Sequence, residues 1–401
     1  MIDIDNEDIV YMGRWTKEDD GLVHGSFECG LVLRFTGTGI KLKGPASGAA
    51  LIAIDGGELR QKTLLRDTRL FRNLSEGEHT LELYAAAQQA LPAIGGFTLD
   101  PGGKTLPPER GKIIEFIGDS IMEGYVDPND AINGVINSYG NSYAFLTGRE
   151  LMKKYGMRFN TVAYGGIRIV GLGDNTTGND PLGMPERYFL DREYRSNVTA
   201  EAERAASQKW DITKYAPDYI VINLGTNDAG QNSLQVSSAM LSFLKELRAA
   251  YENAVIFVMT PFNGTMASAL SEAVSNAKDA DIVLLDTKTW NIKAGSDWLH
   301  PAPAAHIQAS ELLLKALEPY INAAPEPTGA PTDGPEDEPS GTKADDPAAT
   351  GGNLPGKTPG SSGSETEETH NDKKAPVWLF AAGGVLAAAA IVIAVVMKKK
   401  K

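Results

Sequence analysis

The sequence predicts an α/β domain with a parallel sheet flanked by helices, preceded by an all-β domain and followed by a linker and one transmembrane helix. Three observations support this prediction. Apolar and polar residues alternate in short stretches before residue 105, apolar strands alternate with amphipathic helices from residue 111, and one long apolar stretch nearly ends the 401-residue chain. The hydrophobic content of 42% is enough for at least one sizeable core.

Residues 1–105 are expected to form a β-sandwich. Alternating stretches such as Leu31–Phe35 and His79–Tyr84 are separated by glycine or polar turns such as Gly56-Gly57, which is typical of sandwiches and barrels. The domain holds the single cysteine of the chain, Cys29, which excludes an intramolecular disulfide. We expect Cys29 to be a small buried core residue rather than a reactive thiol.

Residues 111–321 are expected to form the α/β domain, because alternating strands and helices imply a parallel sheet with helices on both faces. The predicted strands are Ile113–Ile117, Phe159–Ala163, Tyr219–Leu224, Val255–Met259 and Ile282–Leu285. The predicted helices are Ser142–Tyr155, Val236–Tyr251, Met266–Lys278 and Pro303–Tyr320.

The amino-acid composition of the C-terminal part of the chain changes twice, first at residue 322 and again at residue 375. Residues 322–374 are rich in Pro, Gly, Thr, Ser and acidic residues, so they are expected to form a disordered linker. Residues 375–397 are apolar throughout and would be about 34 Å long as a helix at roughly 1.5 Å per residue, enough to span a bilayer. Residues 398–401 are four lysines and are expected to form a cytoplasmic tail.

The sequence contains conflicting signals about the compartment. The four lysines after the apolar stretch favour a cytoplasmic C-terminus and an exported, extracellular catalytic domain. Residues 1–8 are acidic, and no apolar signal core precedes the β domain, which argues against export. We expect a single-pass protein of the cell membrane whose export signal is missing from this sequence or unconventional; the alternative is a tail-anchored protein with cytoplasmic domains.

The composition argues against several function classes. A formal net charge of −14 gives no support to nucleic-acid binding, which usually shows a basic patch. No Cys/His cluster has the spacing of a zinc site. The chemistry proposed below calls for no metal and no organic cofactor.

Gly118-Asp119-Ser120 directly follows the first predicted strand of the α/β domain. Ligands of open α/β sheets bind beyond the carboxyl ends of the strands, so Ser120 is placed where a nucleophile could act. The alternative is that these three residues only turn the chain.

A serine nucleophile needs a general base, usually a histidine held by a carboxylate. His300 lies in the predicted loop between the last strand and the last helix, at the same sheet edge as Ser120. Asp297 precedes it by three residues, so that one turn brings the carboxylate to the far ring nitrogen. His306 falls just inside the last helix, where a hydrogen-bonded structural role is favoured.

An ester intermediate also needs donors aimed at its oxyanion. Asn227 in Gly225-Thr-Asn-Asp228 follows one strand and can supply its side-chain amide, and Gly165-Gly166 follows another, where a glycine lets a backbone N–H approach the substrate. Alternatively, Gly165-Gly166 only turns the chain, and Asn227 or Asp228 caps the following helix. The gathering of these groups at one edge favours catalysis.

Four blocks of the sequence resemble those of the SGNH (GDSL-like) hydrolases. They are Gly118-Asp119-Ser120, Gly165-Gly166, Gly225–Asp228 and Asp297–His300. The resemblance covers residues 111–320 and implies Ser120 as nucleophile, His300 as base and Asp297 as its orienter. It further implies an oxyanion hole made by the backbone N–H groups of Ser120 and Gly166 and by Asn227, with either Gly165 or Gly166 aligned to the second block. No Gly-x-Ser-x-Gly elbow is present, which argues against the ordinary α/β-hydrolases.

The β domain resembles the jelly-roll that precedes the catalytic domain in carbohydrate esterase family two, with a generic sandwich as the alternative. The resemblance rests on Tyr11–Trp15, Phe35–Gly39, Ile54–Gly56 and Gly77–Leu81. It implies an acetyl xylan esterase type of enzyme, which removes acetyl groups from polysaccharides such as xylan and glucomannan. Some members dispense with the catalytic aspartate, whereas Asp297 is present here.

Trp298 and Trp290 are candidates for stacking on a sugar face, with core packing as the alternative for each. The leading hypothesis is therefore a serine ester hydrolase that deacetylates an acetylated polysaccharide or oligosaccharide. A membrane-tethered glycan-binding protein is an alternative of another class. A lipid or thioester hydrolase would keep the same catalytic residues but would need an apolar acyl pocket.

Overall fold

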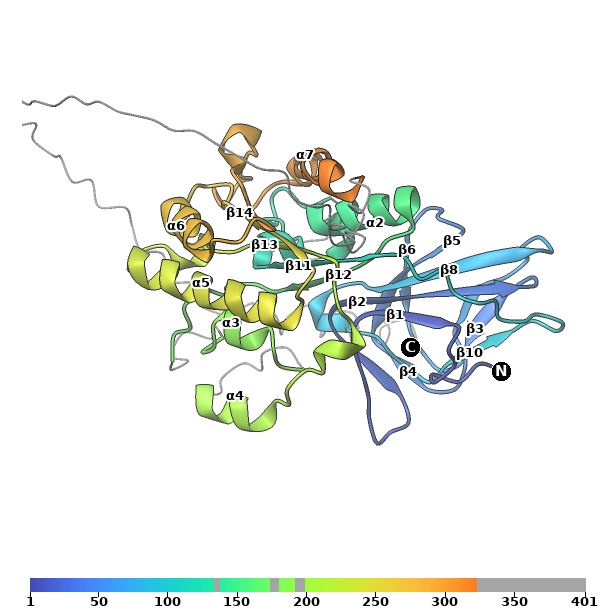
Figure 1. Ribbon diagram of the computed structural model, residues 1–401. Helices are drawn as coiled ribbons and strands as arrows, with labels where there is room; N and C mark the ends of the chain where they lie inside the picture. The colour runs from blue at the N-terminus through green and yellow to red at the C-terminus, as the bar shows by residue number, and fades with distance from the viewer. Residues whose placement is uncertain (133–137, 174–179, 192–198, 323–401) are drawn as a thin grey trace, which may run out of the picture. The chain divides into compact units, whose positions relative to one another are not determined.

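The strands β11 to β15 form the parallel sheet that the alternating pattern predicts (Figure 1). The spatial order of the strands is β12-β11-β13-β14-β15, so the direction in which strands are added reverses at β11. In such sheets ligands bind beyond the carboxyl ends of the strands next to this reversal. The bounds are Ile113–Gly118 (β11), Arg158–Ala163 (β12), Tyr219–Asn223 (β13), Val255–Met259 (β14) and Ile282–Leu285 (β15).

The computed structural model describes residues 1–132, 138–173, 180–191 and 199–322. Apart from Asn322, the predicted linker lies outside these ranges, as do the predicted transmembrane helix at 375–397 and the tail at 398–401. Within the described ranges, no helix has both the length and the apolar composition needed to cross a membrane.

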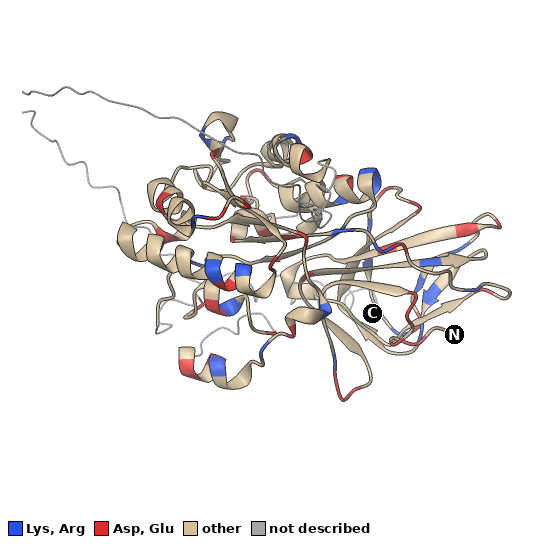
Figure 2. Ribbon diagram, viewed as in Figure 1, with Lys and Arg blue, Asp and Glu red and all other residues tan. Residues whose placement is uncertain are grey.

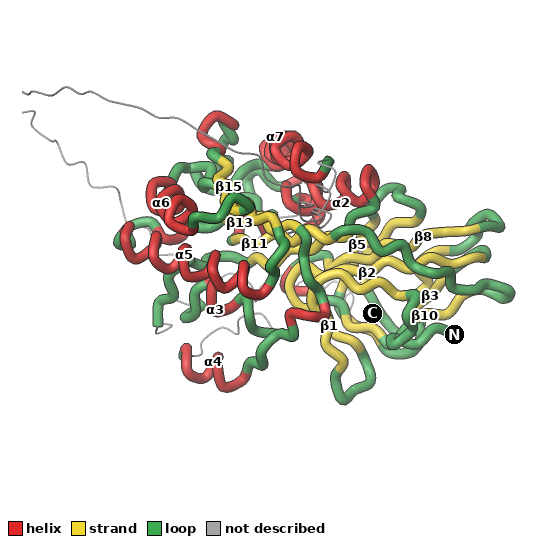
Figure 3. Tube along the Cα trace, in the orientation of Figure 1, coloured by secondary structure: helices red, strands yellow, loops and turns green. Residues whose placement is uncertain are grey.

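Helices cover both faces of the parallel sheet, as predicted (Figure 3). On β13, Val221 belongs to the core cluster that includes α2 and α7, whereas Ile220 and Ile222 belong to the cluster that includes α5 and α6. Successive strand residues point to opposite faces, so both faces of the sheet are buried. The helix bounds are Tyr143–Tyr155 (α2), Ser233–Ala250 (α5), Ala267–Ala277 (α6) and Pro303–Ile321 (α7).

Short-range signals fix the ends of these helices. The Ser142 side chain accepts a hydrogen bond from the backbone N–H of Ala144 where α2 begins, and Gly156 adopts a left-handed conformation (φ 65°) where it ends. Two short helices between β12 and β13 were not predicted: Met184–Arg187 (α3) and Ala200–Ala206 (α4). Neither is long enough for an amphipathic period to be recognised.

The strands before residue 100 form a sandwich of two layers, as the alternating stretches predict. One layer contains β1, β2, β8, β5 and β6, and the other contains β10, β3 and β7. Residues of both layers share a core cluster that includes the buried Cys29, which confirms the expectation for this residue. The bounds are Ile9–Lys17 (β1), Val23–Thr36 (β2), Ile40–Leu42 (β3), Ala46–Ser47 (β4), Ala49–Ile54 (β5), Arg60–Thr63 (β6), Arg69–Phe71 (β7), Glu78–Ala85 (β8), Ala93–Ile94 (β9) and Phe97–Leu99 (β10).

A continuous sheet joins the β-sandwich to the α/β part. Strand β2 pairs with β12 in antiparallel orientation at Glu28 and Thr161, so the parallel sheet is one section of a larger mixed sheet. Arg14 of β1 crosses the same boundary and donates hydrogen bonds to the carbonyl oxygens of Tyr188 and Leu190, both at 2.5 Å. Residues 1–322 therefore pack as one compact unit rather than as two separate domains.

Glu28 is expected to make the stability of the protein depend on pH. Burial raises the pKa of Glu28 from 4.5 to about 8, against a lowering effect of the Thr161 hydroxyl and with a further rise from Glu123. Between these two values the folded state keeps a proton that the unfolded chain releases, so stability falls as pH rises through this window. On going from pH 4.5 to 8, the unfolding free energy of Glu28→Gln should gain roughly 4 kcal/mol relative to wild type. Urea unfolding at both pH values measures this difference. The exposed control Glu76→Gln should show no such change, and a constant difference for Glu28→Gln would contradict the assignment.

Candidate active site

Ser120 lies on a tight turn at the carboxyl end of β11. The Asp119 carboxylate caps the one-turn helix Ser120–Glu123 (α1) by accepting a hydrogen bond from the N–H of Ile121 at 3.0 Å. A Cβ atom on Gly118 would lie only 2.4 Å from Cβ of Met122, so the turn needs glycine at this position. The chain therefore presents Ser120 at the start of a helix, beyond the end of a central strand.

His300 bridges Ser120 and Asp297 through opposite ring nitrogens. Its Nε2 lies 2.8 Å from Oγ of Ser120, and its Nδ1 lies 2.5 Å from Oδ2 of Asp297. With its proton on Nδ1, a neutral imidazole donates to the carboxylate and accepts from the serine hydroxyl. This arrangement lets His300 act as a general base on Ser120. The structure thus brings together three residues that the sequence selected from two segments 180 positions apart.

Both carboxylate oxygens of Asp297 accept hydrogen bonds. Oδ2 accepts from the His300 ring, and Oδ1 accepts from the backbone N–H groups of Leu299 and His300 at 2.9 and 2.8 Å. Partial burial tends to raise the pKa of Asp297, but the hydrogen bonds from His300 and the backbone outweigh it, so this pKa lies below its ordinary value. Asp297 therefore remains ionised while it orients the imidazole.

One aromatic side chain flanks the imidazole, and another lies exposed in the same loop as His300. The Tyr125 ring centroid lies 4.5 Å from that of His300, at an interplanar angle of 57°. Burial, followed by the charge of Asp297, raises the pKa of Tyr125, so its hydroxyl stays protonated. Trp298 lies between Asp297 and Leu299 and is 90% exposed, which excludes the core-packing alternative for this residue. Sequence reasoning missed Tyr125, although it lies only five residues after Ser120.

Asp130 holds the loop that carries His300. Its Oδ2 accepts from the N–H of Ser296 at 2.5 Å, and its Oδ1 accepts from the Ser296 hydroxyl at 2.8 Å. Asp130 follows α1 along the chain, so this contact connects the segment after Ser120 to the segment that carries His300. No sequence pattern pointed to Asp130, because the two residues are 166 positions apart.

Replacing Asp130 with alanine should lower kcat for a small acetyl ester by about 10- to 100-fold, with KM nearly unchanged. Both anchors of Ser296 are lost, and displacing a catalytic group by about 1 Å can cost a factor of roughly 10². Initial rates over a range of substrate concentrations measure the effect. Asp127→Ala is a matched control, since the hydrogen bonds that the Asp127 carboxylate accepts from described residues come from Asn129 in its own loop. Equal rates for the two variants would show that Asp130 does not position the base.

The loop after β12 approaches Ser120. A Cβ atom on Gly165 would lie 3.8 Å from Cβ of Ser120, and Gly166 has a φ of 78°, a conformation that favours glycine. The Asn227 side-chain amide donates to the carbonyl oxygen of Ile167 at 2.9 Å, so Asn227 is in direct contact with this loop. An amide nitrogen carries two hydrogens, and the second can serve another acceptor.

Asp228 also fixes the loop after β12. Its two oxygens accept from the backbone N–H groups of Ile169 and Val170 at 2.9 and 3.0 Å, and burial raises its pKa. The alternative that Asn227 or Asp228 caps the following helix is wrong, because Asn232 caps α5 through hydrogen bonds from Leu234 and Gln235. Asp228 instead connects the turn after β13 to the turn after β12.

His306 and Trp290, both considered in the sequence analysis, take part in packing rather than in the candidate site. His306 is completely buried in α7, and its Nδ1 accepts from the N–H of Tyr143 at 3.3 Å, which confirms the structural role expected for it. Burial lowers the pKa of His306 to about 4, so it is neutral at physiological pH. The Trp290 ring lies 6.3 Å from that of Phe262 and packs against the core cluster below α2 and α7. For Trp290 the structure therefore favours the core-packing alternative.

The charged side chains were compared for metal-binding groups and for their distribution by sign. Among the described residues, no three His, Cys, Asp or Glu side chains form a group that could hold a metal ion. Basic and acidic residues are interspersed over the strand ends and helices rather than gathered by sign (Figure 2). Burial raises the pKa of Asp119, beside the nucleophile, to about 7.

Comparison with known proteins shows similarity in both sequence and structure. The GDSL-like Lipase/Acylhydrolase family matches residues 116–306. The cellulase/esterase CelE of Acetivibrio thermocellus is 29% identical over 344 residues, which cover 79% of this chain and 40% of that protein. The chain therefore spans well under half the length of this relative.

Solved structures resemble both parts of the described chain. A family two carbohydrate esterase from Clostridium thermocellum, in complex with cellohexaose, is 26% identical with a TM-score of 0.62, over 78% of this chain and 99% of that structure. An acetyl xylan esterase from the rumen bacterium Butyrivibrio proteoclasticus is 21% identical with a TM-score of 0.62, over 79% and 97% of the two chains. The similarity thus extends beyond the hydrolase domain to the β-sandwich.

Proposed function

We propose that this chain, which carries a GDSL-like hydrolase domain within the architecture of family two carbohydrate esterases, is a serine esterase that removes acetyl groups from carbohydrate. The observation that carries the proposal is the relay from Ser120 through His300 to Asp297, with contacts of 2.8 and 2.5 Å. The relatives named as carbohydrate esterases support the substrate class. The cellohexaose complex of one of them supports a polysaccharide or oligosaccharide as the partner.

In this mechanism Ser120 Oγ attacks the acetyl carbonyl carbon while His300 Nε2 takes the hydroxyl proton. The tetrahedral intermediate collapses to an acetyl-serine, and His300 returns the proton to the departing sugar hydroxyl. Water then attacks the acetyl-serine with His300 again as base, which releases acetate and restores Ser120. Asp297 stabilises the imidazolium that forms in both halves of the reaction.

The oxyanion of the intermediate needs hydrogen-bond donors. We assign this role to the backbone N–H groups of Ser120 and Gly166 and to the second amide hydrogen of Asn227. Two observations support this assignment: a Cβ added to Gly165 would come within 3.8 Å of Cβ of Ser120, and the Asn227 amide donates to the carbonyl oxygen of Ile167 in the same loop. Trp298, which is exposed and lies two residues before His300, is assigned to stacking on the sugar, whereas Trp290 packs against the core and is not assigned to it.

The substrate class is tested by comparing initial rates of the purified protein on acetylated xylan, acetylated glucomannan and a long-chain fatty acyl ester. Acetate release from at least one glycan, with a much slower rate on the long-chain ester, is expected. A preference for the long chain would favour a lipid hydrolase and overturn the carbohydrate assignment. Glycan binding without any hydrolysis would favour the binding-protein alternative.

For the location of the enzyme, we propose a single-pass membrane protein with its catalytic domain outside the cell. The apolar stretch 375–397 and the four lysines after it support this topology. A protease added to intact cells should release the esterase without lysis. Esterase that becomes accessible only after the cells are broken would instead support a tail-anchored protein with cytoplasmic domains.

A further inference from the structure

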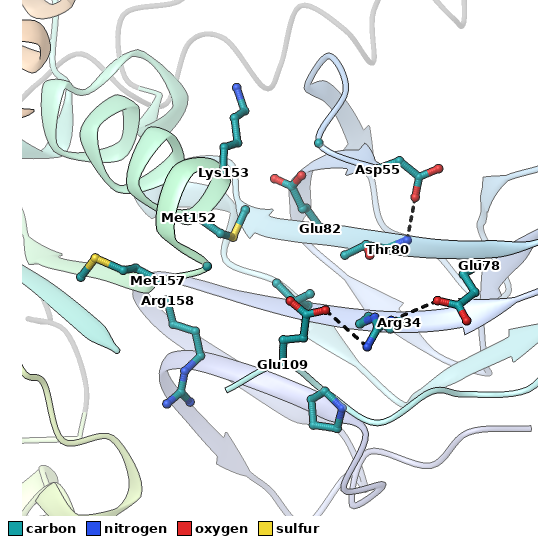
Figure 4. A pocket seen from close by; sticks show the side chains of 14 residues that line it. Arg34, Asp55, Glu78, Thr80, Glu82, Glu109, Met152, Lys153, Met157 and Arg158 are labelled. Carbon is teal, nitrogen blue, oxygen red and sulfur yellow. Dashed lines mark hydrogen bonds and ion pairs between the residues drawn. The ribbon is translucent and has the colours of Figure 1, made fainter. Parts of the chain in front are cut away.

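A cavity lies at the junction of the β-sandwich and the α/β part, away from the candidate active site. It has a volume of about 520 Å³, which is within the range of small-molecule sites. Strands β2 and β8 and the turn after β5 form one wall, and the end of α2 with the start of β12 forms the other (Figure 4). None of the proposed catalytic or oxyanion residues lines it.

The sheet wall of this cavity is made by one face of the β-sandwich. Arg34 of β2 is paired with Thr80 of β8, and Val32 with Glu82, so these four side chains point the same way. Residues that alternate with them, such as Leu33 and Leu81, point into the sandwich core. The face that the sandwich does not need for its own core therefore lines the cavity.

The charges of the cavity wall compensate one another. Arg34 lies 3.1 Å from Glu78 and 3.6 Å from Glu109, and the Asp55 carboxylate accepts from the N–H of Thr80 at 2.7 Å (Figure 4). Lys153 also lines the cavity, and its ammonium group lies 2.8 Å from Glu150. An ionic ligand would find no strong field of one sign here.

The wall nevertheless offers many hydrogen-bonding atoms next to apolar surface. Carboxylates accept from hydroxyl groups, and guanidinium and ammonium groups donate to them. The side chains of Met152, Met157 and Val32 add apolar contacts. This combination suits a neutral molecule that carries many hydroxyl groups on an apolar ring frame.

The cavity is remote from the catalytic edge. Arg158, which lines it, is the first residue of β12, whereas Ser120 follows the carboxyl end of the parallel neighbour β11. The six residues of β12 separate the two places by about 20 Å at roughly 3.3 Å per residue. One sugar residue cannot occupy both places at the same time.

We propose that this junction cavity is a second, non-catalytic binding site for a neutral oligosaccharide segment. The proposal rests on the proposed function, since it assigns the second contact to the same polymeric substrate. A glycan held at the cavity keeps its acetylated residues at a high local concentration around the enzyme. The site thus favours polymeric over small substrates without taking part in the chemistry.

The test observes the cavity directly while the catalytic serine is blocked. The full chain, with ¹³C-labelled methionine methyl groups, is treated with an organophosphonate that reacts with nucleophilic serines, and mass spectrometry locates the adduct. Xylohexaose, mannohexaose and cellohexaose are then titrated separately. The Met152 and Met157 methyl signals should shift in a saturable manner with at least one of them, whereas the signal of Met184, completely buried in another core cluster, stays in place.

A pair of matched variants supplies the second readout. Thr80→Trp fills the cavity from β8 and should weaken the binding of that saccharide at least tenfold. It should also raise KM for the acetylated polysaccharide while leaving hydrolysis of a small acetyl ester unchanged. Thr63→Trp introduces the same side chain at an exposed position of β6 outside the cavity and should have neither effect.

Two results would overturn the proposal: no shift of the Met152 and Met157 signals with any of the three saccharides, or equal saccharide binding by the two tryptophan variants. Failure of the organophosphonate to modify Ser120 would instead count against the proposed function. In that case the methionine signals of the unmodified protein still report on the cavity, so the two failures remain distinguishable.

Discussion

Replacing Ser120 with alanine should lower kcat for a small acetyl ester by about 10⁵- to 10⁶-fold, the scale seen when a serine nucleophile is removed. Without Oγ there is no acetyl-enzyme, and His300 loses the hydroxyl that lies 2.8 Å from its Nε2. The fold should be retained, because the turn is held by the Asp119 cap and by Gly118 rather than by the serine hydroxyl. Initial rates and the thermal unfolding midpoint Tm measure the two effects.

Ser271→Ala is the control for this variant, since Ser271 is an exposed serine of α6 that belongs to none of the four sequence blocks of the site. It should keep both the wild-type rate and the wild-type Tm. An active, well-folded Ser120→Ala protein would refute the nucleophile assignment. Loss of activity together with a collapsed Tm would refute the view that Ser120 is dispensable for folding.

Replacing Asp297 with asparagine should lower kcat by about 10³- to 10⁴-fold, comparable with the corresponding change in a serine protease. The asparagine Oδ1 can still accept from the N–H groups of Leu299 and His300, so the loop keeps its shape. Its NH₂ group would face Nδ1, which then favours the tautomer with the proton on Nε2. That tautomer cannot accept the proton of Ser120.

The Asp297→Ala variant separates the effect of the Asp297 charge from its effect on the shape of the loop. It removes the acceptor of the Leu299 and His300 N–H groups as well as the partner of the imidazole. It should be no more active than Asp297→Asn and should lower Tm further, because two backbone donors lose their acceptor. More than a tenth of the wild-type kcat in Asp297→Asn would show that the backbone alone orients His300. This chain would then behave like those esterases of the resembled family that dispense with the aspartate.

The order of strands and helices could be predicted from the sequence because it depends on short-range patterns. The strand at Val255–Met259 and the sites of Ser120 and His300 beyond strand ends follow from hydrophobic periodicity and from turn residues in the adjacent positions. Asp297 could be paired with His300 for the same reason, since three residues of chain separate them. Local sequence alone therefore determined the main strands and helices of the α/β part and selected Ser120, His300 and Asp297 as candidates for nucleophile, base and orienting carboxylate.

Only the tertiary structure decided which distant residues support these groups. Three contacts join segments more than 100 residues apart. They are the hydrogen bond from Ser296 to Asp130, the hydrogen bond from Arg14 to Leu190 and the strand pairing of Glu28 with Thr161. The merging of two predicted domains into one compact unit depends on the same long-range contacts. Such contacts leave no periodic signal in the sequence, because the partner of a loop carboxylate or of an edge strand is set by how the whole chain packs.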